Sequence, residues 1–80
     1  MPRLRLFGAA RDAAGGPQDD IDGHTVEEVL AAACARYGGT FADVLGRSKV
    51  WVNGAPASPG DPVASSDELA VLPPVSGGYR

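Results

Sequence analysis

The chain has 80 residues, of which 44% are hydrophobic and 21% are charged, and its formal net charge is −3. This length allows one domain, and the composition fits a folded globular protein. The weakly acidic balance argues against a nucleic-acid partner, because phosphates call for clustered Lys and Arg. No apolar run approaches the length of a membrane span, and the N-terminus lacks a signal-peptide core. We therefore expect a cytoplasmic protein without a membrane partner.

The first elements are predicted to be a strand, a short helix and a second short strand. Residues 3–7 alternate polar and apolar side chains, which is the period of a half-buried strand. Residues 8–14 follow as a short helix, which the Gly-Gly-Pro sequence at 15–17 ends. Residues 18–22 form a weaker strand prediction, because three aspartates surround a single isoleucine.

The strongest helix prediction runs from Thr25 to Tyr37. Thr25 is a good N-cap residue, and Glu28 three positions later completes a capping box. Apolar residues recur at i, i+3, i+4, i+7 and i+11, so one face of the helix is apolar. They are Val26, Val29, Leu30, Ala33 and Tyr37. The glycine pair at 38–39 ends this helix, and a second short helix is expected over residues 40–45.

Two more strands are predicted in the last part of the chain. The sequence of residues 49–53 is typical of a strand, and Asn53-Gly54 indicates a tight turn, because both central positions of that turn favour positive φ. Prolines at 56, 59 and 62 predict an irregular stretch after the turn. Residues 68–72 form the last strand, which ends because the two following prolines cannot donate sheet hydrogen bonds.

The order of these elements predicts an α+β domain, in which one main helix packs on one face of a mixed four- to five-stranded sheet. We expect a β-grasp topology, with the first and last strands side by side in the middle of the sheet. The domain is predicted to cover residues 1–75. Residues 76–80 are predicted to be a flexible C-terminal tail that contains Gly77-Gly78 and a two-residue extension, Tyr79-Arg80.

Four segments of the sequence resemble a known family. They are Leu6-Phe7 followed by Arg11 and Gly15, the turn Val52-Asn53-Gly54, the strand start Asp67-Glu68-Leu69-Ala70, and the tail Pro73-Pro74-Val75-Ser76-Gly77-Gly78. Together they are similar to the ubiquitin-like sulfur carriers of the MoaD/ThiS family, and most closely to the small subunit of molybdopterin synthase. The first three segments are weak by themselves, whereas the tail is specific.

The resemblance implies a protein co-substrate rather than an enzyme. In that family an E1-like adenylyltransferase uses ATP to activate the terminal carboxylate, which would be that of Gly78, and a sulfur donor converts it to a thiocarboxylate. The tail then enters the large subunit of a synthase or another sulfurtransferase. No bound cofactor is expected in the carrier, since ATP belongs to the activating enzyme. Molybdopterin is the first candidate pathway, while thiamine, cysteine and natural-product pathways stay open.

The extension Tyr79-Arg80 departs from the family pattern. The Gly78 carbonyl is part of an amide to Tyr79, so there is no carboxylate to adenylate. Two extended residues also add roughly 7 Å, enough to occupy the place of the nucleotide phosphate. We expect a processing peptidase to cleave between Gly78 and Tyr79. Two other interpretations stay open: the chain has kept the fold as a non-conjugated interaction module, or the last two residues are foreign to the natural protein.

A docking surface is predicted from the alternation of the strands. Phe7, Trp51 and Leu72 take the parity that faces away from the helix, where they can form an apolar patch for a partner protein. The tail residues that would enter the partner are Pro73, Pro74, Val75, Ser76 and Gly77. The alternative is that the three large side chains cover a sheet edge or a second small core under Phe41.

Other chemistry-bearing residues receive structural interpretations. Cys34 is the single cysteine, so no internal disulfide is possible, and its place in mid-helix lacks the electropositive setting of a reactive thiol. His24 is interpreted as a solvated turn residue. Asp19, Asp20 and Asp22 are interpreted as a solvated acidic edge rather than a metal site, because a calcium loop needs a longer array of ligands. Arg3, Arg5 and Arg11 could steer the chain toward an acidic partner surface, but plain solvation is the preferred interpretation.

Overall fold

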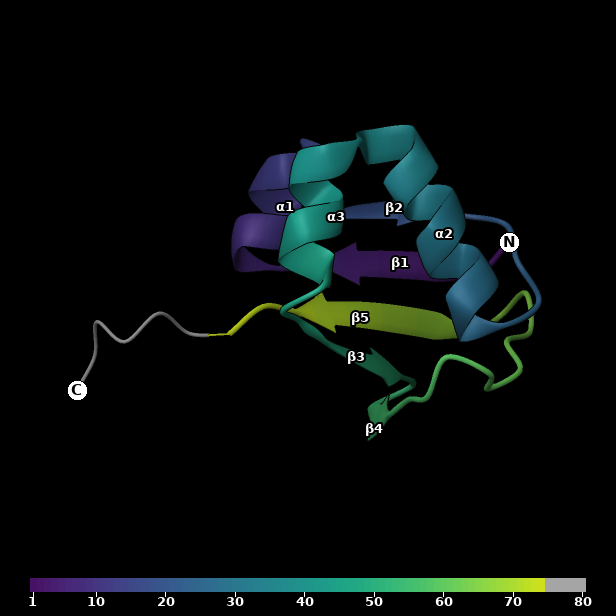
Figure 1. The fold of residues 1–80 in the computed structure, drawn as a ribbon. Coiled ribbons are helices and arrows are strands. Elements are labelled where there is room, and N and C mark those ends of the chain that lie inside the picture. Colours follow the sequence, from purple (N-terminus) through teal and green to yellow (C-terminus); the bar gives the residue numbers. More distant parts are fainter. Residues whose placement is uncertain (75–80) are drawn as a thin grey trace.

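The computed structural model describes residues 1–74. Within them, five strands form one mixed sheet and three helices cover one of its faces (Figure 1). The elements in chain order are β1 (Arg3–Leu6), α1 (Gly8–Ala14), β2 (Gln18–Asp20), α2 (Val26–Tyr37), α3 (Gly39–Leu45), β3 (Lys49–Val52), β4 (Ala55–Pro56) and β5 (Glu68–Leu72). No helix in this part of the chain is long and apolar enough to cross a membrane.

The strands lie in the order β2-β1-β5-β3-β4. Strands β1 and β5 are parallel, with Arg3 level with Glu68 and Leu6 level with Val71. Strand β2 pairs antiparallel with β1, and β3 pairs antiparallel with β5. The first and last strands are therefore neighbours in the middle of the sheet, and the predicted β-grasp topology is confirmed.

The hydrophobic core lies between the sheet and the helices. Alternate side chains of β1 and β5 face the helices and are buried, namely Leu4, Leu6, Leu69 and Val71. All three helices contribute to the opposite side of the core, through Ala10 of α1, Val26, Val29 and Ala33 of α2, and Phe41 and Val44 of α3. The main helix is thus α2, as predicted, but α1 and α3 complete the layer on the same face.

Helix α2 begins at the predicted N-cap. The Thr25 side-chain oxygen accepts a hydrogen bond from the Glu28 N–H at 3.1 Å. The reciprocal half of the predicted capping box differs, because the Glu28 carboxylate accepts from the N–H of His24, at 2.9 Å, and not from that of Thr25. Gly38 ends the helix with a φ of 97°, and its N–H donates to the carbonyl of Cys34.

Strand β4 lies in the stretch that the sequence predicts to be irregular. Asn53 (φ 50°) and Gly54 (φ 84°) form the expected turn. The chain then returns beside β3, so that Ala55 pairs with Val52 and Pro56 with Trp51. A proline is tolerated there because β4 is an edge strand. This two-residue strand covers only the second half of β3.

Candidate functional site

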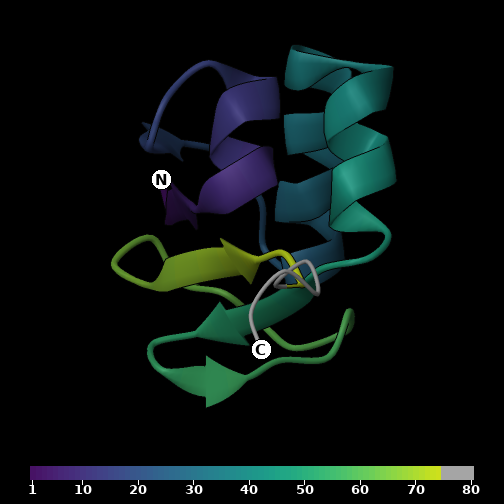
Figure 2. The ribbon, with the colours of Figure 1, turned by 90° about the vertical axis from the view of Figure 1, so that its left-hand side faces the viewer.

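The described chain stops at the root of the predicted tail. Strand β5 ends at Leu72, and Pro73 and Pro74 follow it outside the sheet. The chain leaves the sheet beside the connection from α3 to β3, as the view along the tail shows (Figure 2). A Cβ atom placed on Gly8 would lie 3.9 Å from Pro73 Cγ, so the start of α1 also adjoins this root.

The residues that we assigned to activation, cleavage and most of the insertion lie beyond Pro74. They are Val75, Ser76, Gly77, Gly78 and Tyr79. These assignments lie outside the described residues and stay predictions.

The face of the sheet away from the helices carries the predicted docking residues. Trp51 lies opposite Ala70, and Leu72 lies opposite Lys49. Ala70 and Leu72 flank the buried Val71, so alternation places both on the open face. Phe7 follows β1 with an extended backbone (φ −128°, ψ 154°) and continues the parity of Arg5 onto that face.

These three residues lie outside the core cluster. Phe7 is 41% exposed, whereas Trp51 and Leu72 are half-buried. The partly buried apolar residues that pack against the core include Val50 and Val52 but none of these three. Their role in partner binding stays a prediction.

Phe41 does not form a second core with the predicted docking residues. Its side chain is fully buried in the main core, on the helix side of the sheet. There it makes an edge-to-face contact with Tyr37, at 5.1 Å between ring centroids.

Ion pairs frame the apolar part of the open face. Arg5 pairs with Glu68 at 3.4 Å, and its guanidinium carbon lies 5.9 Å from the centroid of the Phe7 ring. Arg3 pairs with Asp20 at 3.5 Å. Both pairs are exposed, so each contributes little to stability. Arg3 and Arg5 therefore remain largely solvated, as interpreted, although each has a carboxylate partner, and Arg11 is exposed and makes no ion pair within residues 1–74.

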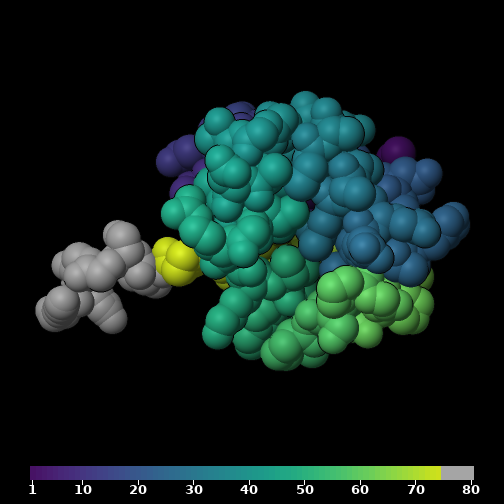
Figure 3. Space-filling view, in the orientation of Figure 1, coloured from purple at the N-terminus to yellow at the C-terminus, as the bar shows by residue number. Residues whose placement is uncertain are grey.

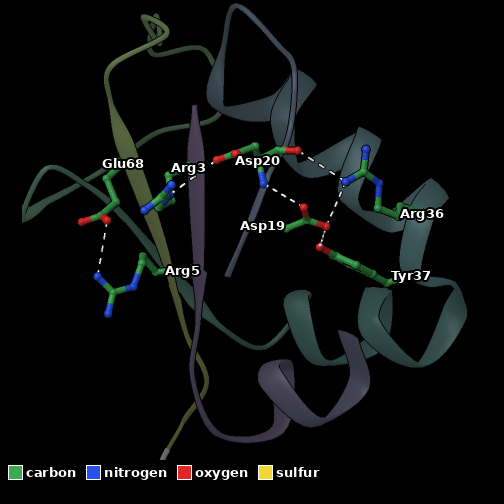
Figure 4. Close-up of polar contacts among 7 residues, drawn as sticks. All are labelled: Arg3, Arg5, Asp19, Asp20, Arg36, Tyr37 and Glu68. Atoms are coloured by element: carbon green, nitrogen blue, oxygen red, sulfur yellow. Dashed lines mark hydrogen bonds and ion pairs between the residues drawn. The ribbon is translucent and has the colours of Figure 1, made fainter. Parts of the chain in front are cut away.

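Asp20 and Asp22 are exposed, as interpreted, but Asp19 is partly buried and hydrogen-bonded (Figure 4). Its carboxylate accepts hydrogen bonds from Tyr37 Oη at 2.6 Å and from Arg36 Nη1 at 2.9 Å. The hydrogen bond from Tyr37, followed by that from Arg36, holds the pKa of Asp19 below its usual value. Burial, followed by the bond to Asp19, raises the pKa of Tyr37 to about 12. This group joins β2 to the end of α2 and has a structural role.

Cys34 and His24 lie on and before α2, away from the tail root. Cys34 is partly buried, and burial raises the pKa of its thiol, so the thiolate is scarce at neutral pH. His24 is exposed. Within residues 1–74, no three His, Cys, Asp or Glu side chains are grouped to hold a metal ion. The candidate site is therefore the tail together with the surfaces around its root.

Two cations near that root were not singled out in the sequence. Lys49 is the register partner of Leu72, and Arg47 lies beside Pro73 and Pro74. Only the pairing of β3 with β5 brings them to the tail, so the sequence alone holds no local signal for this position.

Solved structures share the fold. SAMP1 (small archaeal modifier protein 1) from Haloferax volcanii is 34% identical, with a TM-score of 0.80, and the match covers 95% of this chain and 97% of that chain. A chain of the BexX/CysO complex from Amycolatopsis orientalis is 24% identical, with a TM-score of 0.82 and coverage of 98% and 100%. A chain of the complex of subunits 1 and 2 of molybdopterin-converting factor from Helicobacter pylori is 22% identical, with a TM-score of 0.68 and coverage of 95% and 96%. The last two likenesses show the fold alone.

A family model matches almost the whole chain, although no curated protein matches it. The match is to the ThiS family and covers residues 4–78, from β1 to the second glycine of the tail. It leaves Tyr79 and Arg80 outside. The resemblance inferred from the tail and the strand motifs is thereby confirmed. This chain belongs to the ThiS family of small ubiquitin-like sulfur-carrier proteins.

Proposed function

We propose that this chain carries sulfur on Gly78, once that residue is terminal. The proposal is carried by one observation: the tail Pro-Pro-Val-Ser-Gly-Gly directly follows the central strand β5, and the ThiS match ends at its second glycine. Glycine has no Cβ atom, so a Gly-Gly end is thin enough to enter a narrow channel in another protein. The folded body would then dock while the tail carries the reacting group.

The chemistry of the proposed carrier takes place at one carbonyl carbon. A carboxylate is a poor electrophile, because its negative charge is delocalised over two oxygens. An E1-like adenylyltransferase would join the Gly78 carboxylate to AMP and release pyrophosphate from ATP. A sulfur donor would then form a C–S bond, and the C–O bond to AMP would break. The resulting thiocarboxylate is a nucleophile that can pass its sulfur to an acceptor.

Removal of Tyr79-Arg80 is a necessary step of this proposal. The amide between Gly78 and Tyr79 leaves no free acid to adenylate. We therefore include a processing peptidase among the partners. Hydrolysis of that single bond would produce the Gly78 carboxylate.

The open sheet face is the proposed docking surface for the adenylyltransferase and for a synthase large subunit. The existence of a protein partner is supported by the matched chains from H. pylori and A. orientalis, which both come from complexes with a second protein. Molybdopterin is the first candidate for the pathway that receives the sulfur, because the tail resembles that of the synthase small subunit. Thiamine, cysteine and natural-product pathways are the alternatives.

Mass spectrometry tests the proposal. The chain ending at Gly78 is incubated with the E1-like enzyme of the same organism, ATP and sulfide. We expect a mass gain equal to one sulfur in place of one oxygen, and no change in a control chain that still ends in Tyr79-Arg80. If no E1-like enzyme of the organism adenylates the Gly78 form, the carrier function is wrong.

Protein modification is a second candidate function, favoured by the 34% identity to SAMP1, whose name is that of a modifier protein. The same Gly78 adenylate would then be attacked by a lysine amine, which would form an isopeptide bond and release AMP. The two candidates share the adenylation step and differ in the product. Conjugates that carry the mass of this chain on lysines of other proteins would favour modification.

A further inference from the structure

The connection from α3 to β3 passes beside the root of the tail, where the end of β5 emerges from the body (Figures 2 and 3). Lys49, the first residue of β3, lies opposite Leu72, the last residue of β5. Arg47, two residues earlier, lines a hollow of about 320 Å³. The other walls of this hollow are Ala9, Val44, Pro73 and Pro74. Two cations and an apolar hollow therefore adjoin the point where the tail begins.

Arg47 and Lys49 are both exposed, and neither has an ion-pair partner within residues 1–74. The side chain of Arg47 makes one long hydrogen bond, from Nε to the backbone oxygen of Asp43 at 3.4 Å. By contrast, three other arginines are paired with carboxylates: Arg3 with Asp20, Arg5 with Glu68 and Arg36 with Asp19. The charges of Arg47 and Lys49 are thus available to an outside anion.

Carboxylates gather at the opposite end of the molecule. Strand β5 starts at Glu68, level with Arg3, and ends at Leu72 beside the tail. At the start of β5 lie Asp67 and the loop that reaches the first turn of α2, as the hydrogen bond from Val26 N–H to the Asp61 carbonyl shows. That first turn carries two further acids, Glu27 and Glu28. The exposed Asp43 precedes Arg47 by four residues, but the two cations outnumber it around the tail root, and such local positive charge can orient an acidic partner during approach.

Distance decides which anion these cations can meet. Gly78 lies four residues beyond Pro74, and four fully extended residues span at most about 14 Å. In an active site reached by an extended tail, the phosphates of an adenylate on Gly78 would lie near the far end of that span. With the tail extended in this way, an anion beside Arg47 and Lys49 would belong to the partner protein at the mouth of the channel rather than to the nucleotide.

We propose that Arg47 and Lys49, the tail collar, bind Asp or Glu side chains on the channel rim of the enzyme that activates Gly78. An apolar side chain of the same rim occupies the hollow between Val44 and Pro73. This inference rests on the proposed function, because it concerns the partner of the same tail. The collar and the tail would contact different parts of the enzyme: the collar binds the acidic rim, and the tail enters the channel beyond it.

The test measures binding of the Gly78-ending chain to the purified E1-like adenylyltransferase of the same organism. The variants Arg47→Glu and Lys49→Glu each reverse one charge of the collar. Arg11→Glu is the matched control, because Arg11 is an exposed arginine on α1 that lies outside the hollow and makes no ion pair within residues 1–74. We expect each collar reversal to raise Kd about tenfold at low salt, with a smaller effect at high salt, and the control to bind like the wild type.

The charge-preserving variants Arg47→Lys and Lys49→Arg complete the test, and melting temperatures verify that every variant is folded. These two variants should bind like the wild type, and a loss equal to that of the glutamate variants would overturn the collar. Equal affinities of the wild type and all variants would also overturn the collar. If Gly78 is still adenylated in that case, the proposed function remains intact. Collar-dependent binding without adenylation would contradict the proposed function and would support only the charge-dependent docking by Arg47 and Lys49. Absence of any binding by the wild type would overturn both.

Discussion

A hydrogen bond between the side chains of Tyr37 and Asp19 fixes the short edge strand β2 to helix α2. Strand β2 has three residues and pairs only with β1 among the described strands. The Tyr37 hydroxyl donates to the Asp19 carboxylate at 2.6 Å and joins this edge strand to the end of α2. Hydrogen bonds to charged groups stabilise proteins more than neutral ones. The folded position of β2 therefore depends on a polar contact as well as on the core.

Replacing Tyr37 with Phe removes this hydrogen bond and keeps the ring that packs on Phe41. We expect the free energy of unfolding at pH 7 to fall by about 1–2 kcal/mol, because Asp19 loses a donor. Folding raises the pKa of Tyr37 from 10.0 to about 12, so its contribution is complete below pH 10 and is lost as the pH rises toward 12. Urea unfolding from pH 7 to 12 should show the two curves converge above pH 10. If the free energies of unfolding of the wild type and Tyr37→Phe differed by the same amount from pH 7 to 12, the stabilising role of the Tyr37 hydroxyl would be contradicted.

The lowered pKa of Asp19 makes its contribution to the free energy of unfolding decrease as the pH falls, whereas that of Tyr37 decreases as the pH rises. Its contribution is present above the unfolded value of 3.8 and is lost as the pH falls through the lower folded value. The difference between wild type and Tyr37→Phe should therefore also shrink in that acid range.

Gly23 is required by a close approach between the loop before α2 and the helix itself. A Cβ atom at this position would lie 2.7 Å from Val29 Cγ2 and 2.8 Å from the Val29 backbone nitrogen. We expect Gly23→Ala to lower the free energy of unfolding by about 1–3 kcal/mol, because the helix backbone must shift. Gly16→Ala is the control, since no atom lies within 4 Å of a Cβ there, and thermal unfolding compares the two. Equal stability of both variants would show that the loop relaxes without cost.

At the scale of elements, local patterns predicted most of the sheet and helices. The stripe from Val26 to Tyr37 and the cap at Thr25 predicted α2, because both signals lie within one helix. The strand parity that assigns Leu72 to the open face places Leu69 and Val71 on the helix side, and both are buried. Strand β4 was not predicted, because two residues with a proline carry no period and pair only through the turn at residues 53–54.

Part of the candidate site could likewise be predicted from local sequence, and part could not. The resemblance of the tail to that of the family could be recognised from the sequence, because the motif consists of consecutive residues. The contact of Asp19 with Tyr37 spans 18 residues, and the approach of Lys49 to Leu72 depends on the register of β3 against β5. No local pattern reports such contacts, so the hydrogen bond between Tyr37 and Asp19 and the tail collar could be found only in the folded chain.

The open face of the sheet yields a prediction at this scale. We expect the double change Trp51→Glu and Leu72→Glu to weaken binding to the adenylyltransferase by at least about 30-fold, which corresponds to about 2 kcal/mol, because it places charges in a desolvated apolar interface. The melting temperature should change little, since neither side chain packs against the core cluster. Val71→Glu is the contrasting variant and should unfold the protein, because Val71 is fully buried. Unfolding of the double variant would show that Trp51 and Leu72 belong to a core.

At the scale of the whole molecule, the body and the tail have separate tasks. The compact β-grasp body supplies an open sheet face and a cationic end, and the central strand β5 leads directly into Pro73 and Pro74. In the proposed function the reacting carbon is that of Gly78, which lies beyond the described residues. Under the proposed function the chain would need no catalytic group of its own, because the activating enzymes would supply the acid, base and nucleotide chemistry.

The state of the C-terminus in the native cell tests this account most directly. The intact mass of the protein, isolated from the organism that produces it, reports whether Tyr79 and Arg80 remain. We predict a population whose last residue is Gly78, with part of it carrying sulfur in place of one carboxylate oxygen. If every molecule retains Tyr79 and Arg80, then Gly78 never becomes an acid and the carrier function is contradicted.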